Sequence, residues 1–283
     1  MAKLMNLTKY NHLLVIVPHQ DDEVLMAAGM IYEMGQLGKK VTVCIVTNGD
    51  YECADYSKGR GRLRETLAGL ATLGLSQENV IFLGYADTGM PKKDSFLMKL
   101  YEAKDEEEVF ASSVGNTTYG LEEKQDFHYQ CFGEHGNYCR NTLTGDLREL
   151  LWRINPDVVL TTHGSDCHGD HEALFYFIQD ILKEIDQGQR PELLVGLVHS
   201  KEGDETWPLR EGKLFTCPKG LEESGLIWEE RMVLPLGEQF HGGLKKGNLK
   251  YDALCCYEIA LEPDAVDYLF SFIKEEELFW KIG

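Results

Sequence analysis

The chain has 283 residues, of which 43% are hydrophobic, so it can bury a sizeable core as one large domain or two small ones. Its formal net charge is −19, with 47 acidic side chains against 28 basic ones. Such an excess repels phosphate backbones and anionic lipid, which argues against nucleic-acid binding and against a role at a membrane surface. The acidic runs at 102–108 and 275–277 are expected to be solvated faces.

The sequence shows no sign of export or membrane insertion. Its eight cysteines include no C-x-x-C pair, and a chain of this length does not need disulfide bonds. The N-terminal residues lack an apolar segment followed by a small-residue cleavage site, and the apolar run Leu13–Val17 is too short to span a bilayer. We therefore expect reduced thiols, no transmembrane helix and a cytoplasmic protein.

The first predicted strand ends in a cluster of ionisable side chains. Leu13–Val17 is an unbroken apolar run, which is typical of a strand buried on both faces. Pro18 ends this run, and residues 19–23 read His-Gln-Asp-Asp-Glu. Adjacent carboxylates repel each other, and a bound divalent cation is the simplest way to hold them together. Helical spacing begins at Val24 and ends at Gly38, so the cluster is predicted at a strand-to-helix turn.

Strands and helices then alternate along the chain. Further strands are predicted at 41–47, 80–84, 157–162 and 193–198, and helices at about 63–73, 143–154, 172–186, 249–261 and 265–281. The stretch of about 85–141 has weak periodicity and is expected to be an insert that carries short structure and covers a site. We predict a single domain, 1–283, that contains this insert and a C-terminal extension of about 200–283.

This alternation predicts an α/β fold. We expect a Rossmann-like, doubly wound and mostly parallel sheet with the strand order 3-2-1-4-5. Such sheets bind ligands where the order reverses, which is here between the carboxyl ends of strands 1 and 4. A second cluster, 163–171, is rich in histidine and aspartate and follows strand 4. The predicted topology therefore makes neighbours of two clusters that lie far apart in the sequence.

The two clusters together predict a metal site. A catalytic zinc ion usually has three protein ligands and one open position, and both imidazole and carboxylate suit it. His19 and Asp22 can supply two of these ligands from the first cluster. The third must come from the second cluster, where His171 opens the following helix and His163 and His168 are the other candidates.

Zinc-assisted hydrolysis also needs a base and a hydrogen-bond donor. Asp21 adjoins Asp22 and could deprotonate the attacking water. Protonated His168 could stabilise the developing oxyanion, and Asp170 could hold an imidazole in one tautomer.

These residues resemble the motifs of the PIG-L (LmbE-like) zinc-dependent de-N-acetylases. Residues 18–23 are similar to the P/A-H-x-D-D-E motif of that family. Residues 166–171 are similar to its second motif, often H-P-D-H, with Gly169 in place of proline. The resemblance covers roughly residues 12–200 in order and spacing.

By this resemblance the chain is an enzyme, a zinc-dependent N-deacetylase with one Zn²⁺ per chain. The resemblance implies metal ligands at His19, Asp22 and His171, a general base at Asp21 and an oxyanion-side histidine at His168. The family removes acetyl groups from N-acetylglucosamine units or cleaves related amides. We therefore expect a hydrolase acting on a small N-acetylated amino sugar, and a homo-oligomer, since relatives often associate.

Residues outside the two motifs match the family more loosely. Residues 47–50 and Arg64-Glu65 resemble the loop after the second strand and the start of the next helix, where an arginine tends to contact substrate hydroxyls. Asp50 and Arg64 are therefore predicted to bind substrate. Lys250 and Tyr257 resemble a K…Y segment, but Glu258-Ile259 replace the usual Ser-Gln, which argues against a substrate-side role for the tail.

Other functions fit parts of this pattern. Two histidines and one carboxylate also describe non-haem iron oxygenases. An amidase acting on a sugar–thiol conjugate, or a metal-bound sugar-binding protein without turnover, would use the same residues. Without a metal, the acids at 21–23 would suit the positive end of a helix dipole. A dinucleotide site is disfavoured because the first turn lacks a glycine-rich loop, and no G-x-S-x-G serine elbow occurs.

Overall fold

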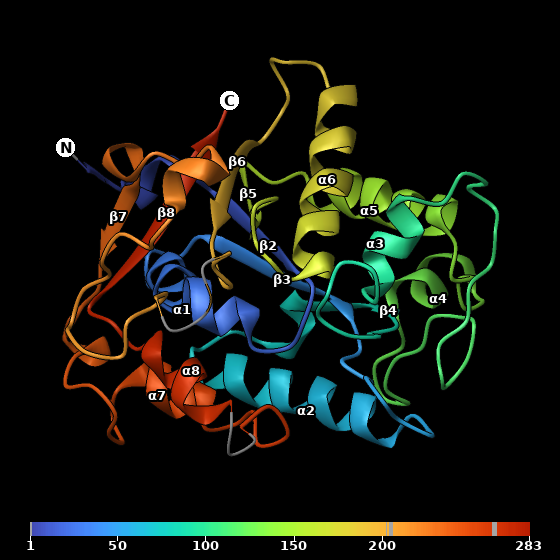
Figure 1. The fold of residues 1–283 in the computed structure, drawn as a ribbon, viewed down its shortest axis with the longest axis horizontal. Coiled ribbons are helices and arrows are strands. Elements are labelled where there is room, and N and C mark those ends of the chain that lie inside the picture. The colour runs from blue at the N-terminus through green and yellow to red at the C-terminus, as the bar shows by residue number, and fades with distance from the viewer. Residues whose placement is uncertain (1, 202, 204–205, 262–264) are drawn as a thin grey trace.

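The computed structural model describes residues 2–201, 203, 206–261 and 265–283 (Figure 1). Its strands are β1 (Lys3–Leu4), β2 (His12–Val17), β3 (Lys40–Thr47), β4 (Val80–Tyr85), β5 (Val158–Thr162), β6 (Glu192–Gly196), β7 (Met232–Pro235) and β8 (Glu276–Ile282). Its α-helices are α1 (Asp22–Gln36), α2 (Ser57–Thr72), α3 (Phe96–Tyr101), α4 (Phe127–Phe132), α5 (Arg140–Ile154), α6 (Gly169–Glu184), α7 (Leu249–Leu254) and α8 (Val266–Ser271). Short 3-10 helices lie at Leu7–Lys9, Gln77–Asn79, Leu221–Ser224, Trp228–Glu230 and Glu238–Phe240.

The central sheet confirms the predicted α/β topology. Within the described residues its order is β1-β7-β8-β6-β5-β2-β3-β4. The five predicted strands form the parallel part, β6-β5-β2-β3-β4, which is the expected order read from the opposite edge. Helices α1 and α2 cover one face of this part, while α5 and α6 cover the other (Figure 1). Strands β2 and β5 are hydrogen-bonded neighbours, so the turns that follow them lie side by side.

Local sequence explains why these elements begin and end where they do. Leu13–Val17 in β2 are fully buried, as the apolar run predicts for a strand covered on both faces. Helix α5 ends at Asn155, whose φ of 45° is left-handed and which Pro156 follows, a combination that stops a helix.

The insert 85–141 carries the short helices α3 and α4. Among the described residues, no helix combines the length and apolarity that crossing a bilayer requires.

The C-terminal extension differs from the prediction. The helix expected at 265–281 is only α8, and the residues after it form strand β8 between β6 and β7. The helix expected at 249–261 is limited to α7. Pairing on both sides buries Leu278, Phe279 and Trp280, and large aromatic residues favour such a strand. This pairing involves distant strands, so local periodicity could not reveal it.

A buried ion pair joins the extension to helix α1. The acidic run 275–277 is not all solvated surface, because Glu277 is only 1% exposed and lies 3.3 Å from Lys250 Nζ. Helix α1 is non-helical at Ala27, with φ −138°, and an unbroken helix would pair Gly29 N with Leu25 O. Instead Glu277 accepts from Gly29 N at 2.8 Å, and Lys250 donates to Leu25 O at 2.7 Å. The extension therefore satisfies the backbone groups that the kink leaves without partners.

Candidate active site

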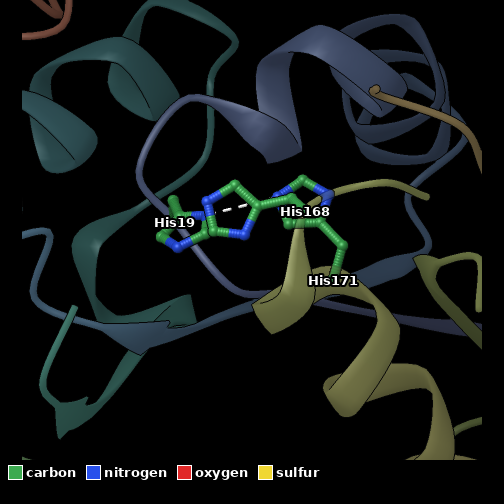
Figure 2. A group of neighbouring side chains, drawn as sticks. All are labelled: His19, His168 and His171. Atoms are coloured by element: carbon green, nitrogen blue, oxygen red, sulfur yellow. Dashed lines mark hydrogen bonds between the residues drawn. The ribbon is translucent and has the colours of Figure 1, made fainter. Parts of the chain in front are cut away.

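Three imidazoles meet at the carboxyl end of the sheet. His19 lies in the turn between β2 and α1, and His168 and His171 lie at the start of α6, just after β5. Figure 2 shows their rings side by side, with a dashed line joining His19 to His171. One nitrogen from each of the three rings lies within 4.8 Å of the others. The neighbouring positions of β2 and β5 thus bring the two sequence clusters together.

Two of these imidazoles share a centre with Asp22. His19 Nδ1 lies 3.2 Å from His171 Nε2 and 3.5 Å from Asp22 Oδ2, and His171 Nε2 lies 3.3 Å from the same oxygen. All three residues are buried. Donors bonded to a tetrahedral zinc ion at 2.0–2.1 Å would be about 3.3 Å apart. The spacing of these three atoms therefore fits one metal ion.

Carboxylates hold the outer nitrogens of both rings. His19 Nε2 lies 3.2 Å from Asp170 Oδ2, and His171 Nδ1 lies 3.1 Å from Asp166 Oδ2. The His19–Asp170 contact is a hydrogen bond, which fixes the tautomer of that imidazole and leaves its other nitrogen free to bind a metal, whereas the His171–Asp166 contact has the distance of an ion pair without hydrogen-bond geometry. The donor set thus continues outward as an alternating series of acids and imidazoles.

Electrostatic coupling within this series is strong. Burial alone would raise the pKa of Asp22, but His171 and His19 hold it well below its usual range. Burial alone would lower the pKa of His19, but hydrogen bonds to Asp170 and Asp22 raise it to about 9. The same competition, with Asp166 and Asp22 as the acids, raises the pKa of His171. The carboxylates around both rings therefore create a negative field that favours a cation, and a metal bound there would displace the proton from each ligating nitrogen.

Asp21 has a strained backbone beside this centre. Its φ is 105°, a left-handed value that costs a residue other than glycine about 1–3 kcal/mol. Glu23 Oε2 accepts a hydrogen bond from Asp21 N at 3.0 Å, and Tyr257 donates to the other oxygen of Glu23 at 2.5 Å. The extension therefore helps to hold the conformation that directs Asp21 into the cavity.

The carboxylate of Asp21 faces Arg62. Arg62 Nη2 lies 3.5 Å from Asp21 Oδ2 and donates to Gln20 O at 2.9 Å. Gly49, at φ 61°, permits this approach, because a Cβ there would lie 2.4 Å from Arg62 Nη1. Burial raises the pKa of Asp21 to about 7, although Arg62 acts to lower it. A carboxyl group with a pKa near neutrality is suited to accept and return a proton.

His168 is held as a neutral donor. Its Nδ1 accepts a hydrogen bond from Asp170 N at 3.2 Å, so in the neutral ring the proton is on Nε2. Burial and the nearby rings of His19 and His171 lower the pKa of His168 well below its usual range. The geometry therefore favours a neutral imidazole that donates from Nε2, where the sequence suggested a protonated one.

Gly169 occupies the position where the motif that this segment resembles often has proline. Gly169 N donates to Met90 O at 2.9 Å, a bond that proline could not make. A Cβ on Gly169 would lie 2.7 Å from Lys92 Cα and 2.4 Å from Ser95 Oγ. The insert therefore packs directly against the start of α6, where only glycine fits.

The centre opens into a cavity of about 290 Å³. Its lining comes from both sequence clusters, from the first turns of α1 and α2, from the segments that follow β3, β4 and β6, and from the extension. The lining residues are His19, Asp21, Asp22, Leu25, Tyr51, Lys58, Arg62, Asp87, His168, His171, Val198, His199, Ile259, Ala260, Ala265, Tyr268 and Leu269.

Four candidate residues from the sequence do not line this cavity, namely Asp170, which bonds His19 from outside, and the three that follow. His163 bonds Ser165 Oγ at 2.7 Å, and burial lowers its pKa to about 4. Asp50 is buried behind the cavity, where it accepts hydrogen bonds from Tyr119 Oη and Asp87 N, each at 2.9 Å. Arg64 is half-exposed and pairs with Glu123 at 3.0 Å.

Arg62, and not Arg64, lines the cavity. Residues two apart on a helix project about 200° apart, so only one of these two arginines can face Asp21. The helical stripe Leu63, Leu67 and Leu70 could not indicate which one, because Arg62 and Arg64 lie about 100° to either side of Leu63. The sequence also contained no indication of Asp87, which follows β4 and lines the cavity. The same holds for the lining residues of the tail, which are Ile259, Ala260, Ala265, Tyr268 and Leu269.

The fold and this donor set describe an α/β enzyme with its candidate centre at the topological switch point of the sheet. The model of the PIG-L family, described as GlcNAc-PI de-N-acetylase, matches residues 14–182, which is more than half of the chain. The chain therefore belongs to the PIG-L family, whose namesake activity is de-N-acetylation.

Solved structures show the same fold at low sequence identity. The A40926 pseudoaglycone deacetylase has a TM-score of 0.56 and 17% identity, with 96% of this chain and 97% of that chain covered. The N,N'-diacetylchitobiose deacetylase from Pyrococcus horikoshii has a TM-score of 0.54 and 14% identity, with 97% and 85% covered. The 4-carboxy-2-hydroxymuconate hydratase from Pseudomonas putida has a TM-score of 0.52 and 15% identity, with 96% of each chain covered. A search of curated proteins found no match.

Proposed function

We propose that this protein is a zinc-dependent hydrolase that removes an acetyl or related acyl group from an amino sugar. The observation that carries the proposal is the convergence of His19 Nδ1, Asp22 Oδ2 and His171 Nε2 beside Asp21 in an open cavity. Family membership supports the reaction class. The fold alone does not select it, because one protein of this fold is a hydratase.

His19, Asp22 and His171 would hold one zinc ion per chain. Bound there, zinc would lower the pKa of a water molecule to about 7 and polarise the amide carbonyl. Asp166 and Asp170 support this role by orienting the two imidazoles from outside.

Asp21 and His168 supply the proton chemistry in this proposal. Asp21 takes a proton from the attacking water and returns it to the amine as the C–N bond breaks. Its pKa of about 7 suits both transfers. His168 donates from Nε2 to the carbonyl oxygen, where negative charge develops.

The loops after β3 and β4 and the start of α2 would bind the sugar. Arg62 and Asp87 line the cavity together with Tyr51 and Lys58, so this side offers both donors and acceptors for hydroxyl groups. Aromatic faces such as that of Tyr51 also suit the apolar face of a sugar ring. We propose Arg62 and Asp87 as substrate-binding residues, with Asp50 supporting Asp87 from behind.

The test is release of free amine and acetate from N-acetylglucosamine, diacetylchitobiose and a sugar–thiol conjugate. We expect equal amounts of both products, loss of activity with a chelator and recovery when zinc is added back. Asp21→Asn should retain zinc but lose about 10²–10⁴-fold in rate. Absence of amine release by zinc-loaded protein would refute the proposal, and substrate-dependent oxygen consumption would indicate an iron oxygenase instead.

A further inference from the structure

The cavity has two chemically different sides. The proposed ligands come from the turns after β2 and β5, in the middle of the sheet, and Arg62 and Asp87 come from the β3–β4 side. The opposite side is formed by the residues that follow β6 and by the extension. Here the lining includes an apolar wall, which is formed by Leu25, Val198, Ala260, Ala265 and Leu269.

Hydrogen bonds fix the position of this apolar wall. Tyr268 Oη donates to Val198 O at 2.6 Å, which ties α8 to the end of β6. Beside the wall, Ile259 packs against Gly61 next to Arg62, and its N donates to Glu65 at 3.1 Å, which ties the segment after α7 to α2. The Tyr268 ring also stacks on His199 with centroids 5.2 Å apart. The wall is therefore a built surface whose parts come from distant segments of the chain.

We propose that the apolar wall binds the acyl chain of the substrate, and that the enzyme prefers N-acyl groups longer than acetyl, such as butanoyl. This inference rests on the proposed function. A secondary amide is planar and trans, so its two carbon substituents point in opposite directions. With the carbonyl at the proposed ligands and the sugar toward Arg62 and Asp87, the acyl chain extends toward the apolar wall.

The size of the cavity limits this chain. Its volume of about 290 Å³ is at the lower end of the roughly 300–1,000 Å³ typical of small-molecule sites. A sugar ring and a short acyl group are therefore favoured over a long fatty acyl chain. The reaction itself is unchanged: water adds to the amide carbon, the C–N bond breaks, and a carboxylate and a protonated amine leave.

The experiment compares N-acetyl-, N-propanoyl-, N-butanoyl-, N-hexanoyl- and N-dodecanoylglucosamine as substrates of the zinc-loaded full chain. Each methylene that leaves water should raise kcat/KM about fourfold, which corresponds to about 0.8 kcal/mol. We expect butanoyl to exceed acetyl by about tenfold and dodecanoyl to fall below butanoyl. Amine release that is fastest with acetyl would overturn this inference alone. Absence of release from every substrate would instead count against the proposed function.

Two variants of the apolar wall should change this preference in opposite directions. Ala260→Phe narrows the wall and should lower the butanoyl-to-acetyl ratio of kcat/KM at least tenfold. Leu269→Ala widens it and should move the preferred chain to hexanoyl. Ala68→Phe, on the exposed side of α2, is the matched control and should leave the ratio unchanged. If Ala260→Phe lowers both substrates equally, the wall contacts another part of the substrate and the inference is wrong.

Discussion

The candidate centre and the C-terminal extension bury charge in different ways. At the centre, His19, Asp22 and His171 pair mainly with other ionisable side chains, and all three line a cavity. In the extension, Lys250 and Glu277 are enclosed and bond the backbone of α1. A charge cluster that lines a cavity is available for chemistry, whereas charges that hydrogen-bond enclosed backbone groups stabilise the fold. The following experiments separate these two roles.

His171→Ala should have the largest effect. Without this imidazole the donor set loses one of its three converging atoms, so we expect loss of zinc and a fall in kcat/KM of at least about 10³-fold, since metal assistance is worth several kcal/mol. Zinc content per folded protein and the rate measure both effects. His163→Ala is the matched control, because that histidine is buried but bonds Ser165, and it should retain zinc. Full zinc content in His171→Ala would contradict the assignment.

Lys250→Met should lower the stability of the extension without changing metal binding at the centre. Removing one member of a buried ion pair leaves the other charge uncompensated, and we expect a loss of about 3–5 kcal/mol in the free energy of unfolding, measured with urea. Zinc content per folded protein should not change. Lys9→Met removes a partner of Glu192 that is 2.9 Å away and far more exposed than Lys250, and it should cost less than about 1 kcal/mol. Equal losses from the two variants would show that the buried pair has no special role.

Asp170→Asn tests whether the outer carboxylates support the centre. Asp170 accepts from His19 on one oxygen and from Leu97 N at 2.7 Å on the other, so the change weakens the hold on His19. Loss of such an outer partner typically costs 10–100-fold in metal affinity or activity, and we expect that range. Zinc competition with a chromogenic chelator measures the affinity. An unchanged affinity and rate would make Asp170 a purely structural residue.

Arg62→Ala and Arg64→Ala form a matched pair on one helix. Arg62 lines the cavity, and the loss of a charged hydrogen bond to the substrate should raise KM about tenfold or more. Arg64 pairs with Glu123 at the surface, and its removal should change KM by less than twofold. Steady-state kinetics on the best N-acyl substrate distinguish the two. A larger effect from Arg64 would restore the assignment made from the sequence.

The smallest expected effect comes from a partly exposed cluster around Glu192. Burial would raise the pKa of Glu192, but hydrogen bonds from Lys281, Tyr10 and Lys9 lower it from 4.5 to about 2. Because the pKa is lower in the folded state, this stabilisation is present above pH 4.5 and is lost as the pH falls toward 2. Glu192→Gln should therefore destabilise the protein by less than about 1 kcal/mol at pH 7 and not at pH 2. Urea unfolding at both pH values provides the measurement.

Much of the sheet could be predicted from the sequence alone. Apolar runs such as Leu13–Val17 form buried strands wherever both faces are covered, and their alternation with helices leaves few topologies open. The same reasoning indicated that the turns after β2 and β5 would be adjacent. It did not reveal β8, because its partners β6 and β7 lie far away in the sequence and the local spacing also suits a helix.

The sequence by itself determined the strand order, the two histidine- and aspartate-rich clusters and the family, because these depend on local patterns and on connection rules. Only the tertiary structure decided which side chains face the cavity. It selected Arg62 over Arg64 through the phase of α2, and it set His163 apart from the converging imidazoles. It also buried Glu277 and formed the apolar wall from the extension. Side-chain direction and long-range pairing depend on the packing of the whole chain, which no local pattern encodes.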